Sequence, residues 1–237
     1  MPCITKPIIM YNTLRIKRNI CFVAVLLLLS IFQSCLSNST RNIYKKSRKW
    51  IFNVGFYAPN GKLIDSCPLT MEVKSVSSDS SISDYRNITY AFTFDNCSGQ
   101  PLYATTSISE SNGEVSIPSP ELGNLAFTTL LPSPSVSSPL ITGVSSDIKI
   151  DVYKSEYTPA SGKRLTQNRE IDGNKQFTFN GKTIDCSVIK GRNTNYLKEL
   201  GQYQCEFLFN DTYGFVSFFY KKPDGETVKI DLRKTNF

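Results

Sequence analysis

The cysteines are the side chains with the most evident chemistry in this sequence. The chain has seven cysteines and no histidine. Without histidine there is no Ser–His or Cys–His nucleophile pair, and without a Cys-x-x-Cys spacing a zinc site is not expected. A pair of carboxylates could hydrolyse glycosides. However, four acidic residues fall at the outward-facing positions of predicted strands, so we interpret them as solvated side chains. These are Asp65, Asp185, Glu206 and Asp231. The sequence therefore predicts no catalytic residue, no metal and no cofactor.

The first 35 residues have the pattern of a secretory signal. Arg15, Lys17 and Arg18 form a basic patch, an apolar run follows over 20–29, and small and polar residues lead to Cys35. We expect residues 1–34 to be removed as a signal peptide. Met10 is an alternative start that would leave a signal of conventional length. The apolar stretch is shorter than the roughly 20 residues of a transmembrane helix.

The end of this segment resembles the lipobox of bacterial lipoproteins, in particular those of the Bacteroidetes cell envelope. Ser34 fits the small position before Cys35, whereas Phe32 and Gln33 depart from the strict pattern. The resemblance implies that Cys35 is the lipid attachment site and that a membrane, expected to be the outer membrane, is the partner. Secretory cleavage after Ser37 without lipidation, and an uncleaved anchor, are the alternatives.

The charge of the chain argues against a nucleic-acid partner. The net charge is +7, with 27 Lys and Arg against 20 Asp and Glu. Four of these cations precede Cys35 and five lie in 41–49, so from Trp50 onward 18 cations face 20 acids. Because the folded part is not basic, nucleic-acid binding is not expected. We interpret 35–49 as a basic tether, which either is merely solvated or contacts anionic lipid headgroups.

The remaining cysteines are expected to form disulfides. Four are left in the mature chain: Cys67, Cys97, Cys186 and Cys205. An even number in an exported protein indicates two bridges. Cys186 and Cys205 each lie on the apolar face of a predicted strand, so we predict a Cys186–Cys205 bridge if the strands are neighbours, and Cys67–Cys97 by elimination. The alternative is that all four are small buried hydrophobes.

The pattern beyond Trp50 predicts an antiparallel β protein. Apolar residues alternate with polar ones in 50–57, 88–95, 148–153, 184–188, 203–209 and 227–232. Residues 215–220 are apolar on both faces, which indicates a strand covered on both sides or lining a cavity. Turn signals at 59–61, 180–181 and 223–225 separate strand-like runs. We expect an all-β antiparallel sheet system, either a half-barrel or a sandwich.

A long Ser/Pro-rich stretch interrupts the strand pattern. Residues 107–146 contain five prolines, and only 125–131 within them reads as a strand. Proline cannot donate to a central ladder, so this stretch is expected to be a loop, an edge or a flap. Each flank is small for a lone domain, so we expect one domain over 50–237 with a long excursion.

The C-terminal third adds a second resemblance. Residues 177–186 and 209–216 are similar to the tail of small β-rich Bacteroidetes lipoproteins of unknown function. By fold analogy only, such sheets resemble half-barrel lipoprotein carriers, which implies an apolar ligand on the concave face. We expect a non-catalytic binding or scaffolding lipoprotein. The alternatives are a secreted glycoprotein, given sequons at Asn38, Asn87, Asn96 and Asn210, and a carboxylate-dependent glycoside hydrolase.

Overall fold

The computed structural model describes most of the chain after residue 42. The described residues are 43–78, 86–95, 102–110, 113–121, 123–137, 140–143, 145–151, 164–194 and 201–237. The first strands are β1 (Lys49–Tyr57), β2 (Leu63–Ser78), β3 (Arg86–Phe94) and β4 (Leu102–Glu110). The middle of the chain forms β5 (Glu114–Ser116), the 3₁₀-helix η1 (Gly123–Leu130) and β6 (Ser135–Ser137). The last strands are β7 (Ser145–Asp151), β8 (Arg164–Phe179), β9 (Lys182–Asn193), β10 (Gln204–Asn210), β11 (Gly214–Lys221) and β12 (Thr227–Thr235).

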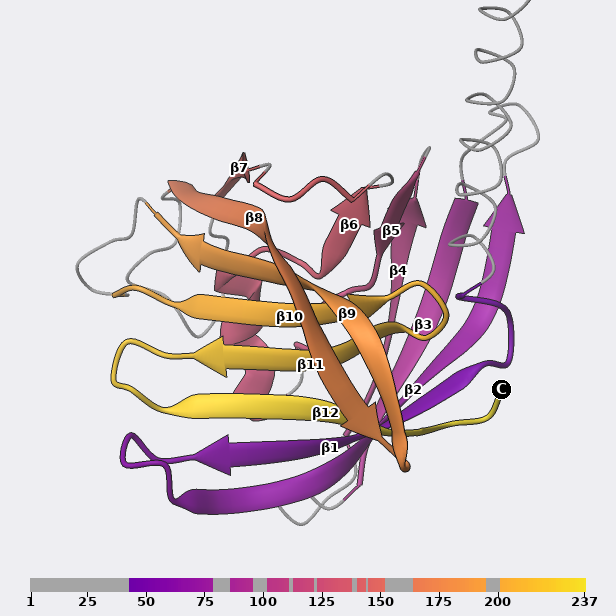
Figure 1. Ribbon diagram of the computed structural model, residues 1–237, viewed down its shortest axis with the longest axis horizontal. Coiled ribbons are helices and arrows are strands. Elements are labelled where there is room, and N and C mark those ends of the chain that lie inside the picture. The colour runs from indigo at the N-terminus through magenta and orange to yellow at the C-terminus, as the bar shows by residue number, and fades with distance from the viewer. Residues whose placement is uncertain are drawn as a thin grey trace, which may run out of the picture.

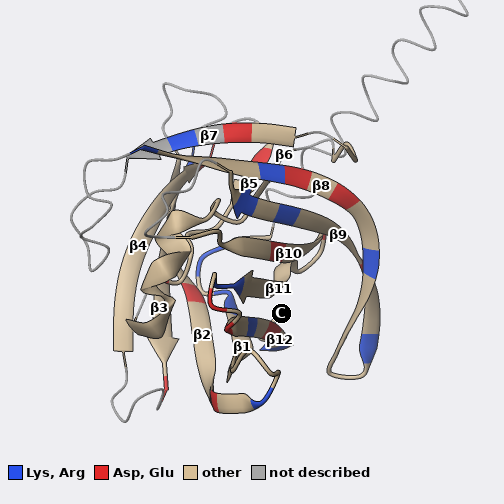
Figure 2. Cartoon of the chain, turned by 90° about the vertical axis from the view of Figure 1, so that its left-hand side faces the viewer, with Lys and Arg blue, Asp and Glu red and all other residues tan. Residues whose placement is uncertain are grey.

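Ten of these strands form one antiparallel sheet. Their order is β4-β3-β2-β1-β12-β11-β10-β9-β8-β7, and pairing of β1 with β12 joins the two ends of the chain. The sheet is open and curved, and β5, β6 and η1 lie on its concave side (Figures 1 and 2). The predicted all-β antiparallel fold is confirmed, as one open sheet with a small two-stranded sheet beside it.

The hairpin turns form where the sequence predicts them. Asn180 and Gly181 join β8 to β9 with φ values of 46° and 73°. Positive φ at both central residues is the geometry of a type I′ turn, which Asn-Gly favours. Gly61 and Gly225, in the turns after β1 and β11, also have positive φ.

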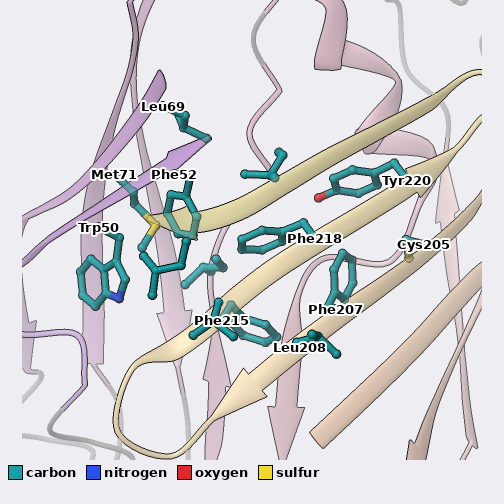
Figure 3. Close-up of a cluster of buried hydrophobic side chains, with 14 of the residues drawn as sticks. Trp50, Phe52, Leu69, Met71, Cys205, Phe207, Leu208, Phe215, Phe218 and Tyr220 are labelled. Atoms are coloured by element: carbon teal, nitrogen blue, oxygen red, sulfur yellow. The ribbon is translucent and has the colours of Figure 1, made fainter. Parts of the chain in front are cut away.

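The core lies on the concave face and is rich in aromatic rings. Phe207 packs edge to face against Phe218 at 5.8 Å between centroids and against Phe215 at 6.2 Å. Phe52 of β1 reaches the same cluster, 5.6 Å from Phe218 (Figure 3). These rings come from strands of both ends of the chain, so the described strands of the large sheet share one core.

The Ser/Pro-rich stretch is packed rather than exposed. Leu125, Phe127 and Leu130 of η1 are buried in the core. Phe127 stacks on Tyr203 at 5.8 Å and meets Tyr220 at 5.9 Å. The predicted strand over 125–131 is wrong, because Gly123–Leu130 form a 3₁₀-helix. In such a helix residues three apart lie above one another, as Phe127 and Leu130 do.

A buried ion pair joins β3 to β4, and its carboxylate also contacts β5. The Arg86 guanidinium lies 2.6 Å from the Glu110 carboxylate, and only 3% of the Glu110 side chain is exposed. The second Glu110 oxygen accepts a hydrogen bond from the Ser116 N–H at 3.0 Å. Burial raises the pKa of Glu110, and the Arg86 charge opposes that rise.

The folded part begins earlier than predicted. Ile43 and Tyr44 are buried, and the Tyr44 hydroxyl accepts a hydrogen bond from the Phe215 N–H. Arg48 donates to the Ile43 carbonyl and lies over the Phe237 ring at 4.1 Å. Ile43, Tyr44 and Arg48 therefore pack on the domain, whereas Lys45, Lys46 and Lys49 are exposed. The rest of the predicted tether lies outside the described residues.

Candidate functional site

The hairpin formed by the end of β8 and the start of β9, residues 174–186, extends over the outer face of the sheet. We call this segment the arm. The pairing of β9 with β10 stops at Ser187, so β9 residues before it pair only with β8. A bulge in β8 between Ile171 and Asn174, with Gly173 at a φ of 87°, bends the hairpin. The arm crosses in front of β10, β11 and β12 (Figure 1).

Aromatic packing holds the arm in this position. The Phe179 ring lies 5.0 Å from Tyr213 in the turn after β10, and Phe177 stacks beside Phe179 at 6.2 Å. The Asn210 amide donates to the Asp185 carbonyl at 2.9 Å. The arm therefore covers part of the outer face.

Next to the root of the arm, the outer face carries a polar groove of about 280 Å³. Its lining residues come from four adjacent strands, β8 to β11: Asn168, Glu170, Lys190, Gly191, Arg192, Gln204, Cys205, Glu206 and Phe219. This volume is slightly below the range of about 300–1,000 Å³ that is typical of small-molecule sites. A second hollow of about 640 Å³ lies at the arm tip and is lined by Asn53, Asn180, Asp231, Leu232, Arg233 and Lys234.

The strand register orders the groove side chains in two rows. One row runs across the sheet as Glu170, Lys190, Glu206 and Phe219, which are successive cross-strand partners. The parallel row, two residues along each strand, is Asn168, Arg192 and Gln204. Alternation places both rows on one face, opposite the core.

The charged groups of the groove differ in how far they are neutralised. Lys190 pairs with Asp172 at 2.5 Å, and this hydrogen bond raises the pKa of Lys190. Glu206 pairs with Lys175 of the arm at 3.3 Å. Arg192 makes no hydrogen bond or ion pair with any described residue, although it is exposed at the centre of its row. The groove therefore contains one cation without a protein counter-ion among the described residues.

The structure separates two of the predicted site residues. Cys186 and Cys205 lie on neighbouring strands, as expected, but both are free thiols. Cys205 lies opposite Gly191 of β9 and so shares its face of the sheet. Cys186 is five residues before Gly191 on the same strand, and because side chains alternate between the two faces, the two sulfurs point to opposite faces. The predicted Cys186–Cys205 bridge is wrong. Burial raises the pKa of the Cys186 thiol to about 12 and that of Cys205 further.

Of the other predicted site residues, only Cys67 lies among the described residues. Cys67 is disulfide-bonded, and Cys97, its predicted partner, lies outside the described residues, as does Cys35. Within the described ranges no cluster of three or more potential ligands could hold a metal ion. No helix of the described part has the length and apolarity needed to cross a bilayer.

The alternation of 203–209 places Gln204 and Glu206 on the outward face, but it assigns neither of them to a site. Sequence reasoning missed Arg192, because it has no distinctive spacing. No pattern in the sequence shows that β8, β9 and β10 are aligned so that Arg192 lies between Asn168 and Gln204.

The fold has counterparts among solved structures. No family model matches the chain, and no curated protein is similar enough in sequence to match. A candidate lipoprotein from Parabacteroides distasonis superposes with a TM-score of 0.54 at 14% identity, over 81% of this chain and 96% of that one. A candidate exported protein with a YmcC-like fold from Bacteroides fragilis gives 0.46 at 11% identity, over 81% and 97%. The chain thus has the fold of a candidate Bacteroidetes lipoprotein, which agrees with the resemblance seen in its sequence.

Proposed function

We propose that this protein is a lipid-anchored, non-catalytic binding module of the bacterial cell envelope, and that its ligand contacts the outer groove. The anchor would be a lipid on Cys35, most simply in the outer membrane, after removal of 1–34. The lipobox-like sequence supports this part of the proposal, and the shared fold is consistent with it. The second predicted bridge, Cys67–Cys97, is retained in the proposal.

The observation that carries the binding role is the position of Arg192. It lies between the amides Asn168 and Gln204, in a concave site with an aromatic side chain, Phe219, in the neighbouring row. A guanidinium has five donors and no acceptor, so its natural partner is a carboxylate or a phosphate. A polar, anionic ligand would supply what the described protein residues do not.

The apolar ligand implied by fold analogy has less support. Leu125, Phe127 and Leu130 occupy the concave face that an acyl chain would need. Such a ligand would have to displace side chains that are buried in the core. The outer groove therefore fits the binding role better.

The glycoside hydrolase alternative has one observation in its favour. Glu170 and Glu206 both line the groove, two strands apart, which places their backbones about 10 Å from one another. An inverting enzyme needs its sugar and a water between two carboxylates. Lys190 fills the register position between them, so the arrangement does not leave that space.

The glycoprotein alternative is weakened at one sequon. The Asn210 side-chain nitrogen, the atom that glycosylation would modify, donates to the Asp185 carbonyl. The Asn210 oxygen accepts from the N–H groups of Thr212 and Tyr213. Glycosylation here would require those turn contacts to rearrange.

The proposal can be tested with protein extracted from its own envelope. Native mass spectrometry of the full chain should detect a retained compound that is lost in Arg192→Gln. Arg233→Gln, which removes a cation in the second hollow, is the matched control and should retain the compound. Equal retention by both variants, or no retained compound in the unmodified protein, would count against binding in the groove.

A further inference from the structure

The outer groove is lined by regularly spaced side chains, most of which end in a planar amide, carboxylate or guanidinium group. Neighbouring strands are about 4.8 Å apart, and the two rows are about 6.7 Å apart along each strand. The row of four residues therefore spans about 14 Å across the sheet. Arg192, Gln204 and Glu170 have no hydrogen-bond or ion-pair partner among the described residues. Their donors and acceptors face the groove together.

Together these side chains match a ligand that combines an anionic group, hydrogen-bond donors and an apolar surface. Arg192 requires an anion, and a carboxylate matches its planar fork. A carboxylate such as that of Glu170 accepts hydrogen bonds, so it calls for donors such as hydroxyls. Gln204 offers both a donor and an acceptor, whereas Asn168 donates to Ser145 at 2.7 Å and to Asp147 at 2.9 Å and so offers a ligand its carbonyl oxygen. Half-buried Phe219 offers an apolar surface beside these polar groups.

We infer that the outer groove binds an acidic saccharide, that is, a sugar or sugar chain with a carboxylate. This inference rests on the proposed function and names the ligand class of that site. An acidic saccharide of this kind presents a carboxylate, several hydroxyls and an apolar C–H face within a few ångströms. The open groove lets a chain pass across the strands.

Charge distinguishes this ligand from an acyl chain or a strongly anionic polymer. Lys190 and Glu206 each form an ion pair within the protein. Among the described residues Arg192 forms none, and Glu170 acts on Lys190 through its charge without an ion-pair contact. The closely spaced charges of a polyphosphate would be repelled by Glu170, whereas a uronate chain carries a single charge on each sugar, with hydroxyls between, and so fits better. A nucleotide has a similar set of groups and is tested separately below.

Titration of the full-length processed protein with defined probes tests the inference. Tri-galacturonate supplies carboxylates and hydroxyls, maltotriose supplies hydroxyls alone, and AMP supplies a phosphate with an aromatic base. Backbone NMR shifts of Arg192, Gln204 and Phe219 report binding in the groove. We expect saturable shifts with tri-galacturonate and weaker binding of maltotriose and AMP.

Two variants and a control separate the contributions. Arg192→Gln should weaken tri-galacturonate binding by about 10- to 100-fold, because it removes a charge-assisted hydrogen bond. Phe219→Ala should weaken tri-galacturonate and maltotriose by similar factors, because an apolar contact does not depend on the carboxylate. Lys234→Gln, in the second hollow, should leave both affinities unchanged.

The outcomes also separate this inference from the proposed function. Absence of saturable shifts with tri-galacturonate, or tighter binding of AMP, overturns the acidic saccharide. If a compound retained from the native envelope is nevertheless lost in Arg192→Gln, the groove binds something else and the proposed function survives. Equal binding of tri-galacturonate by Arg192→Gln and the unmodified protein overturns the role of the carboxylate.

Discussion

The buried ion pair between Arg86 and Glu110 provides the sharpest test of the packing. The side chains are 15% and 3% exposed, and the carboxylate also accepts the Ser116 N–H. Glu110→Gln keeps an acceptor for Ser116 but leaves the Arg86 charge buried without this partner. Breaking a buried pair in this way costs about 3–5 kcal/mol. For a domain of this size each kcal/mol lowers the melting temperature by about 2–4 °C, so we expect a decrease of about 6–20 °C.

The pH dependence gives an independent reading of the same pair. Burial raises the pKa of Glu110, opposed by Arg86. An acid with a higher pKa in the folded state binds its proton more tightly when folded, so its contribution to stability declines as the pH rises from about 4.3 through the raised pKa. Arg86→Met removes the opposing charge. Its loss of stability should therefore be largest at pH 7 and smaller near pH 4–5.

Calorimetry of the single variants and of Arg86→Met/Glu110→Leu measures these effects. The double variant removes both charges, so it should recover most of the stability that either single change loses. A cost below about 1 kcal/mol for Glu110→Gln is the value of an exposed pair and would refute the reasoning from burial.

Three further outcomes are expected. Cys35→Ala should leave the protein unprocessed or soluble, because stable anchoring needs the lipid chains; processed protein in the detergent phase would contradict lipidation. Cys186 and Cys205 should both be alkylated after unfolding without reductant, and only slowly at pH 8 when folded, since burial raises both pKa values; a Cys186–Cys205 disulfide peptide would show that the register is wrong. Phe179→Ala removes the contact with Tyr213, so amide hydrogen exchange in 174–186 should rise while the core strands stay protected; unchanged exchange would mean that other contacts hold the arm.

The strands were predictable because their signals are local. Alternation in 203–209 and 227–232, and the Asn180-Gly181 turn, each depend on residues a few positions apart. The 3₁₀-helix was not predictable in the same way. Its residues have no amphipathic pattern long enough to outweigh the prolines around them, and only the tertiary core explains why Phe127 is buried.

Register was the main feature that the sequence could not provide. Since β9 ends at Asn193 and β10 begins at Gln204, the stretch between them in the sequence is too long for a two-residue hairpin turn to set the alignment of the strands. The observed register places Gly191 opposite Cys205, and a Cβ at Gly191 would lie 2.7 Å from the Cys205 sulfur and 3.0 Å from Pro132. Close packing of 123–137 against β9 thus favours this alignment. The groove depends on the same register, so it was equally hidden.

The two faces of β9 and β10 have different roles, one in packing and the other in lining the groove. Beside the groove, odd-numbered residues such as Ile189 and Phe207 face the core, whereas Lys190 and Glu206 face the groove. Substitutions at these groove positions can therefore accumulate without disturbing the core, and ligand preference can diverge between relatives that share the fold. A single-residue insertion in either strand would have the opposite effect, because it would exchange the two sets and destroy both at once.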